Sequence, residues 1–143
     1  MFTAVVVASL LAPAADLNEA TKKELKALEG EWSVVATAQD GKETEPPADE
    51  RIAVTVTGTT FTFGKFGDGQ VTALDPSTGP KIVDFKMLRK PESGVTNEGI
   101  FKIEKGTLTV VLYVGEGNKR PASFDVPKDA DTIRFTLKRV DKK

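Results

Sequence analysis

The 143-residue sequence contains neither cysteine nor histidine. Without cysteine there are no disulfides and no thiol nucleophiles, and without histidine there is no Ser-His relay. The two absences together remove the usual nitrogen and sulfur ligands of transition metals. We therefore expect no cofactor, no metal site and no catalytic residue, and a protein that is not an enzyme.

An excess of charge of one sign is also missing, because the formal net charge is −1 and the isoelectric point is near 5.6. This balance gives no reason to expect nucleic acid or an anionic membrane surface as a partner. Apolar residues make up 39% and charged residues 29% of the chain. These are ordinary values for a globular protein, so we expect one domain, and we expect it to be a monomer.

No apolar run is long enough to span a bilayer comfortably. Residues 1–15 carry no charged side chain, and their apolar run ends in Ala12-Pro13-Ala14. The stretch resembles the apolar region and cleavage site of a secretory signal peptide, although the basic residues that usually precede them are missing. We expect export to the periplasm or the exterior, with residues 16–143 forming the domain. The alternatives are a buried strand or an N-terminal anchor.

A short amphipathic helix is predicted for residues 17–28. Leu17, Thr21, Leu25 and Leu28 recur at helical spacing, with lysines and glutamates between them. Gly30 is well placed to end the helix, because glycine tolerates a left-handed backbone conformation after the last turn. The leucine stripe is expected to pack on the open end of a barrel.

From Trp32 the apolar period changes to two, which predicts strands. On the first strand, Trp32, Val34, Ala36 and Ala38 are expected to share one face. Further alternating segments follow at residues 52–57, 60–63, 71–74, 83–87, 101–103, 108–112 and 133–139. Eight short strands with one apolar face each can form a sandwich or a closed barrel, and closure also removes the exposed edges. We predict an all-β fold, an eight-stranded antiparallel meander barrel with a short N-terminal helix.

Several stretches, taken in order, point to a known family. They are Gly30-x-Trp32, Leu74-Asp75-Pro76 with Pro80-Lys81-x-x-Asp84, Gly99-Ile100-Phe101-x-Ile103 with Gly106-Thr107-Leu108, Arg120-Pro121-x-x-Phe124, and Phe135-x-Leu137-Lys138-Arg139. Over about residues 25–140 the chain resembles an uncharacterised lipocalin-like family that is abundant in planctomycete bacteria. The resemblance implies a small calycin-like barrel behind a leader, and it implies no activity, substrate or catalytic residue.

The resemblance also suggests how the barrel closes. In lipocalins a basic residue of the last strand lies over the conserved tryptophan, and Arg139 has the parity to lie over Trp32, beside Gly30. The alternative is that Arg139 lies in solvent at a frayed terminus. The chain departs from true lipocalins because it is short and lacks the middle Thr-Asp-Tyr motif.

Five inward-facing phenylalanines allow two interpretations. Phe61, Phe63, Phe85, Phe101 and Phe135 either line a pocket for a small apolar ligand or simply fill the core. An eight-stranded barrel is just wide enough for either arrangement. The short strands favour the filled core. Tyr113 has the opposite parity to Leu112 and is expected to face outward or to lie at a rim.

Arg120, Pro121 and Phe124 lie in the long polar connection before the last strand. This connection could act as a lid or as a partner-binding surface, because loops on a rigid scaffold carry specificity. Alternatively, Phe124 only plugs the mouth of the barrel while Pro121 stiffens the approach. The plug is the favoured interpretation.

Four acidic residues lie within residues 43–50, around Pro46-Pro47. Paired carboxylates can perform acid-base chemistry when burial separates their pKa values, but a polar proline-containing loop favours solvated carboxylates. Two functions therefore stay open for the domain. One is a binding module for a small apolar molecule, with its opening near residues 115–131, and the other is a protein-interaction or inhibitor-type barrel with a filled core and active rim loops.

Overall fold

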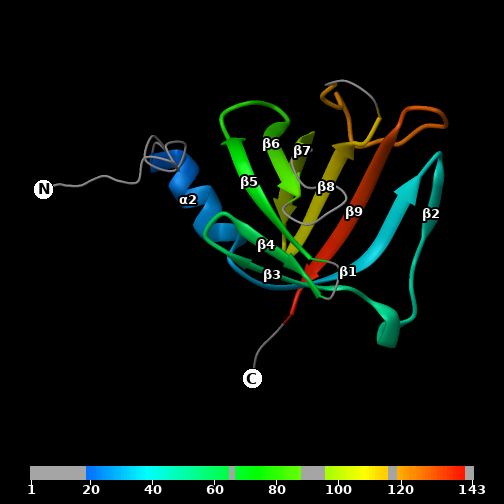
Figure 1. Cartoon of the computed structure of the whole chain (residues 1–143), viewed down its shortest axis with the longest axis horizontal. Helices are drawn as coiled ribbons and strands as arrows, with labels where there is room; N and C mark the ends of the chain where they lie inside the picture. Colours follow the sequence, from blue (N-terminus) through cyan, green and yellow to red (C-terminus); the bar gives the residue numbers. More distant parts are fainter. Residues whose placement is uncertain (1–18, 65–66, 88–95, 116–118, 141–143) are drawn as a thin grey trace, which may run out of the picture.

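The structure is a computed structural model that describes residues 19–64, 67–87, 96–115 and 119–140 (Figure 1). The predicted signal segment, residues 1–15, lies outside these ranges. The described elements, in chain order, are α2 (Glu19–Leu28), β1 (Gly30–Gln39), β2 (Lys42–Thr44), the 3-10 helix η3 (Ala48–Glu50), β3 (Ala53–Thr57), β4 (Thr60–Phe63), β5 (Asp68–Asp75), β6 (Lys81–Met87), β7 (Thr96–Glu104), β8 (Thr107–Tyr113) and β9 (Thr132–Arg139).

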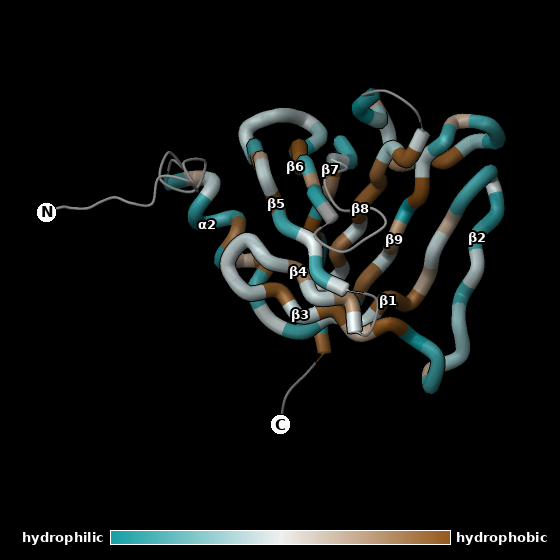
Figure 2. Tube along the Cα trace, in the orientation of Figure 1, coloured by the Kyte–Doolittle hydropathy of each residue, from teal (hydrophilic) through white to brown (hydrophobic). Residues whose placement is uncertain are grey.

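The strands form one antiparallel meander that closes on itself. Each strand from β3 to β9 pairs with its neighbour in sequence, and β1 pairs with β3 on one side and with β9 on the other. The short strand β2 adds only to the end of β1, through residues 37–39. Eight strands therefore make the closed barrel, as the sequence predicted, and its shape is consistent with a lipocalin-like fold. Figure 2 shows apolar and polar residues alternating along β3 and β9, as expected for strands with one buried face.

Helix α2 covers the end of the barrel at which β1 begins. Leu25 and Leu28 are buried in the interior cluster, and Thr21 Oγ1 donates a hydrogen bond to Leu74 O at 3.2 Å. Lys81 Nζ lies 2.8 Å from Glu24 Oε2, which ties the helix to the start of β6. Leu25 and Leu28 of the predicted stripe therefore pack on the barrel, as their spacing indicated, and Leu17 lies outside the described residues.

A β-bulge in β1 divides its buried residues between two faces. Trp32 and Val34 belong to the interior cluster, but the pairing with β9 shifts register between Val34 and Ala36. Beyond the shift, Ala38 is 3% exposed and packs on the outer side of the wall. The expectation that all four alternate residues share one face is therefore wrong, because one extra residue in a strand reverses the direction of the side chains that follow.

Two apolar clusters stabilise the fold. The larger one fills the interior, and the smaller one, here called the outer cluster, comprises Ala38, Ile100, Val111 and Val126 with Phe124 packed against them. Tyr113 follows Val111 by two residues and so shares its outer face, yet it is only 8% exposed. The outward direction predicted for Tyr113 agrees with the register of β8. Its side chain is nevertheless buried, because other residues cover this part of the outer face.

Candidate functional site

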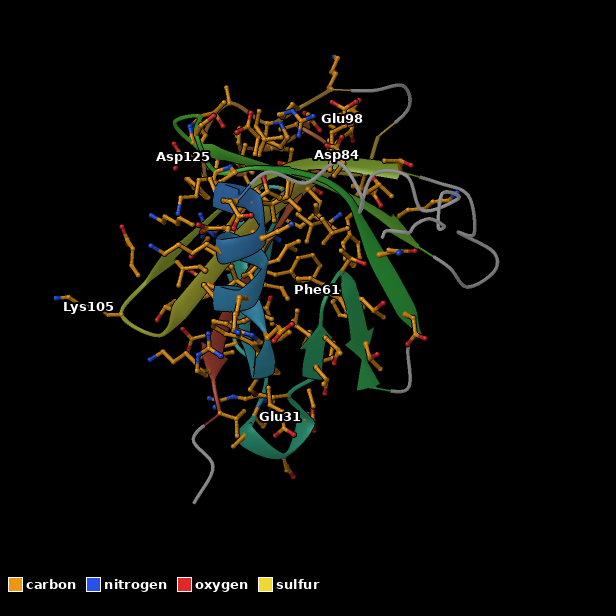
Figure 3. All side chains as sticks on the ribbon, turned by 90° about the vertical axis from the view of Figure 1, so that its left-hand side faces the viewer. Glu31, Phe61, Asp84, Glu98, Lys105 and Asp125 are labelled. Carbon is orange, nitrogen blue, oxygen red and sulfur yellow. The ribbon has the colours of Figure 1, made fainter. Side chains whose placement is uncertain are left out.

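The interior of the barrel contains a cavity of about 250 Å³. Fourteen of the described residues line it, and thirteen of these are apolar. They come from α2, from six strands of the barrel and from the residue just before β3, and are Leu28, Val34, Ile52, Phe61, Phe63, Val83, Phe85, Asn97, Phe101, Leu108, Val110, Leu112, Phe135 and Leu137. All five phenylalanines singled out in the sequence are among them. Figure 3 shows Phe61 pointing into the space behind α2.

Three of the aromatic rings make one rigid wall of the cavity. The ring centroids of Phe61 and Phe85 are 5.2 Å apart with an interplanar angle of 81°, and those of Phe63 and Phe85 are 5.6 Å apart at 82°. These edge-to-face contacts add to the energy of burial and hold the rings in place. The Phe85 ring also lies against Gly69, where an added Cβ would overlap it. The wall is therefore pre-formed.

The filled interior favoured by the sequence is not what the structure contains. Val34, Val83 and Val110 occupy inward positions where larger side chains would be needed to reach across the barrel. Gly69 contributes no side chain on the same face. Five phenylalanines are gathered partly on one wall, so their total volume does not fill the centre, and packing could not be judged from their number alone.

Asn97 is the one polar residue among those that line the cavity. It lies on the inward face of β7, opposite Phe85 of β6. Its Nδ2 donates a hydrogen bond to Tyr113 O at 3.0 Å. Sequence analysis missed Asn97, because an isolated asparagine outside the predicted strands carries no signal of facing inward. No charged side chain lines the cavity within the described ranges.

The opposite end of the interior is sealed by Trp32 and Arg139. Trp32 is completely buried, and its Nε1 donates a hydrogen bond to Leu28 O at 2.8 Å. The guanidinium carbon of Arg139 lies 4.1 Å from the indole centroid, in the stacked arrangement that the sequence predicted. Leu28 contributes its side chain to the cavity, so the helix, the tryptophan and the cavity form one continuous unit.

The same arginine ends helix α2. Arg139 Nη1 donates to Glu29 O at 2.8 Å and Nη2 donates to Ala27 O at 2.6 Å. Ala27 lies in the last turn of α2, where carbonyl oxygens have no partner within the helix, and Glu29 directly follows that turn. At Gly30 the backbone turns with φ of +127°, and an added Cβ would lie 2.8 Å from Arg139 Nη1. Gly30 is thus required both by its conformation and by the close approach of Arg139.

The described part of the long connection before β9 lies outside the barrel wall. Arg120 Nη1 lies 2.8 Å from Asp84 Oδ1, and Arg120 Nη2 lies 3.5 Å from Glu98 Oε1. The two carboxylates are directly paired across β6 and β7, so the guanidinium neutralises two like charges. Arg120 Nη1 also donates to Gly99 O at 3.0 Å. Figure 3 shows Asp84 and Glu98 together on one side of the sheet, away from Phe61.

Phe124 does not plug the barrel mouth. It packs against the outer cluster, with Lys102 Nζ 4.8 Å from its ring centroid, and its carbonyl accepts a hydrogen bond from Arg134 Nη1 at 2.8 Å. Pro121 lies in the same outer segment, between Arg120 and Phe124. The plug predicted for Phe124 is therefore wrong for the described part of the connection, whereas the lid and the partner-binding surface stay predictions. The missed signal was the consecutive apolar residues at positions 99–101 and 110–112, since such runs indicate strands buried on both faces.

The carboxyl of Asp75 has a perturbed pKa, but it lies in the exposed turn after β5. Ser77 Oγ and Ser77 N both donate to Asp75 Oδ1, at 2.6 and 2.9 Å, and these hydrogen bonds lower the pKa of Asp75 below 3.8. Within the described ranges, no group of three or more acidic side chains is arranged to hold a metal ion. Among the same residues, no helix is both long and apolar enough to cross a membrane. The chain matches no protein-family model, no curated protein and no solved structure.

Proposed function

We propose that this protein is a non-enzymatic binding protein that holds a small apolar molecule inside its barrel. The observation that carries the proposal is the cavity of about 250 Å³ with thirteen apolar residues among its fourteen. Apolar cavities of this kind do not hold water favourably, because water finds no hydrogen-bond partners there. An apolar ligand would instead gain from the surface that both partners remove from water, about 25 cal/mol per Å².

The size of the cavity limits the ligand. A dry apolar cavity of roughly 150 Å³ admits benzene, and pockets for drug-sized ligands span roughly 300–1,000 Å³. The volume of about 250 Å³ lies between these two cases. The proposed ligand is therefore larger than a single aromatic ring and smaller than a typical drug.

The same proposal includes that the protein is exported, that it belongs to the lipocalin-like family and that it catalyses no reaction. The apolar stretch at residues 1–15 and its Ala-x-Ala site support export to the periplasm or the exterior. The barrel, its terminal helix and the stacked Trp32–Arg139 pair support membership of the planctomycete lipocalin-like family. Cell fractionation with N-terminal sequencing tests export, because a mature chain beginning near Ala15 or Asp16 is expected outside the cytoplasm.

A cavity-filling variant tests the binding proposal. Val110→Phe adds a ring to the lining of β8 and should reduce affinity for the neutral fluorescent probe N-phenyl-1-naphthylamine by tenfold or more, measured by fluorescence titration. Thr109→Val, on the outer face of the same strand, is the matched control and should bind as the wild type does. Equal probe affinity in the wild type and Val110→Phe would contradict the proposal, and so would failure of the wild type to bind any apolar probe.

The competing proposal of a protein-interaction barrel has less support. It requires a filled interior and exposed apolar residues on the rim loops. The interior contains a cavity, and in residues 119–131 the large apolar side chains Phe124 and Val126 pack on the outer wall.

A further inference from the structure

We propose that the ligand is a neutral amphiphile with one hydrogen-bonding group, and that Asn97 binds this group. The inference rests on the proposed function, because it assumes that the cavity takes a ligand. It assigns the chemical class of that ligand and the residue that selects it.

The position of Asn97 gives the cavity a polar end and an apolar end. Asn97 and Phe101 lie on the same face of β7, and both line the cavity. Leu28 lines the cavity beside buried Trp32, at the end where β1 begins. Asn97 lies near the start of β7, at the end of the barrel where β1 finishes, because β7 runs antiparallel to β8 and β8 to β9. A ligand would therefore place its apolar body towards Leu28 and its polar group at Asn97.

The amide of Asn97 is held in one orientation. One N–H donates to Tyr113 O at 3.0 Å. This bond lies just past the end of the β7–β8 pairing, which begins with Gly99 opposite Leu112. A primary amide has a second N–H donor and a carbonyl acceptor. Within the described part of the chain, the bond to Tyr113 is the one hydrogen bond recorded for this side chain. A hydroxyl or carbonyl of the ligand would thus meet an oriented partner.

The charge of the lining restricts the ligand to neutral molecules. No cationic or anionic side chain lines the cavity within the described ranges. Moving an unpaired charge into an apolar cavity costs far more free energy than one hydrogen bond returns. Alcohols, phenols, ketones and amides therefore fit, whereas a carboxylate of the same carbon skeleton does not.

The alternative is a purely structural role, in which Asn97 adds one hydrogen bond to Tyr113 O at the end of the β7–β8 pairing. The test separates these roles with three ligands that share one skeleton: naphthalene, 2-naphthol and 2-naphthoate. Their affinities are measured near neutral pH for the wild type, Asn97→Leu and the matched control Thr109→Val. Dividing the affinity for 2-naphthol by that for naphthalene removes any effect that a variant has on both ligands equally.

The ratio is expected to fall by roughly threefold to tenfold in Asn97→Leu, the loss of one net hydrogen bond, and to stay unchanged in Thr109→Val. In the wild type, 2-naphthoate is expected to bind at least tenfold more weakly than 2-naphthol. If Asn97→Leu does not fold, as judged by thermal unfolding, Asn97→Thr replaces it. That hydroxyl is too short to replace the amide, so the ratio is again expected to fall.

The outcomes distinguish the two proposals. An unchanged ratio in the variant, or equal weakening of both neutral ligands, would overturn the role of Asn97 while the binding function stands. Tighter binding of 2-naphthoate than of 2-naphthol would overturn the neutral class. If none of the three ligands binds to the wild type, the proposed function itself fails together with this inference.

Discussion

At the scale of single residues, Arg139 does three things at once. Its guanidinium stacks on Trp32, and it donates to two carbonyl oxygens at the end of α2. Lysine could not make these contacts together, because only the planar guanidinium combines stacking with two divergent donors. The residue therefore joins the last strand, the first strand and the helix at the sealed end of the barrel.

Replacing Arg139 should measurably weaken the fold. We expect Arg139→Ala to lower the free energy of unfolding by about 1–3 kcal/mol, since a cation–π contact and two hydrogen bonds to a charged group are lost at a partly solvated site. Urea unfolding followed by Trp32 fluorescence measures the change. Lys138→Ala, on the neighbouring exposed position, is the control and should change stability little. A loss no larger than that of the control would contradict this role.

Gly69 is a second residue whose importance comes from its surroundings. A Cβ at this position would overlap the Phe85 ring, which forms two edge-to-face contacts in the cavity wall. Gly69→Ala should push that ring into the cavity and reduce affinity for N-phenyl-1-naphthylamine several-fold. The expected loss of stability is about 1–3 kcal/mol, typical of overpacking. Unchanged affinity and unchanged stability would show that Phe85 has room to move elsewhere.

At the scale of elements, residues 119–131 of the connection between β8 and β9 pack against the outer wall of the barrel. Arg120 fastens it to β6 and β7, and Phe124 and Val126 pack on the outer cluster. Val126 O also accepts a hydrogen bond from Gly41 N at 2.7 Å, which joins the connection to the β1–β2 turn. These contacts stabilise the barrel and lie away from the cavity lining.

Phe124→Ala should therefore separate stability from binding. We expect a loss of about 2 kcal/mol in the free energy of unfolding, less than for a fully buried phenylalanine because Phe124 is only partly buried. The affinity and dissociation rate of N-phenyl-1-naphthylamine should stay at wild-type values. Thermal unfolding and stopped-flow fluorescence measure the two quantities. Faster dissociation of the probe would instead show that the segment gates the cavity.

The turn after β5 is predicted to respond to acid. Because hydrogen bonds from Ser77 lower the pKa of Asp75 in the folded state, their stabilisation is present above the unfolded pKa and is lost as pH falls through the lower, folded pKa. Ser77→Ala should raise the pKa of Asp75 towards 3.8, as measured by NMR titration. An unchanged pKa in this variant would mean that the hydrogen bond from Ser77 Oγ does not form in solution.

At the scale of the whole molecule, closure and cavity depend on each other. Pairing of β1 with β9 closes the eight-stranded barrel and encloses the space that the phenylalanines line. A ligand in this space binds the folded chain and not the unfolded one. It should therefore stabilise the protein by about 2.7 kcal/mol at a free concentration one hundred times its dissociation constant.

Thermal unfolding with and without 2-naphthol measures this linkage. The midpoint should rise with ligand concentration in the wild type and rise clearly less in Val110→Phe. The Thr109→Val variant should respond as the wild type does. A rise of equal size in Val110→Phe would show that the ligand binds outside the barrel.

Much of the fold could be predicted because its signals are local. The spacing of Leu25 and Leu28 specifies the helix, and alternating residues such as those of 133–139 specify strands with one buried face. The meander order follows from short turns such as Lys105-Gly106. The stacking of Arg139 on Trp32 was accessible through family resemblance and parity, because the last strand of a closed meander ends beside the first.

The sequence by itself thus determined the strands and their order, since these depend on near neighbours along the chain, while family resemblance and strand parity together indicated the two residues that seal one end. The tertiary structure alone decided the outward turn of Ala38, the burial of Phe124 on the outer wall, and the inward position of Asn97. These depend on register between segments far apart in sequence. The cavity also belongs to this second group, because empty volume is set by how side chains from six strands and a helix meet, and no single segment carries a signal for it.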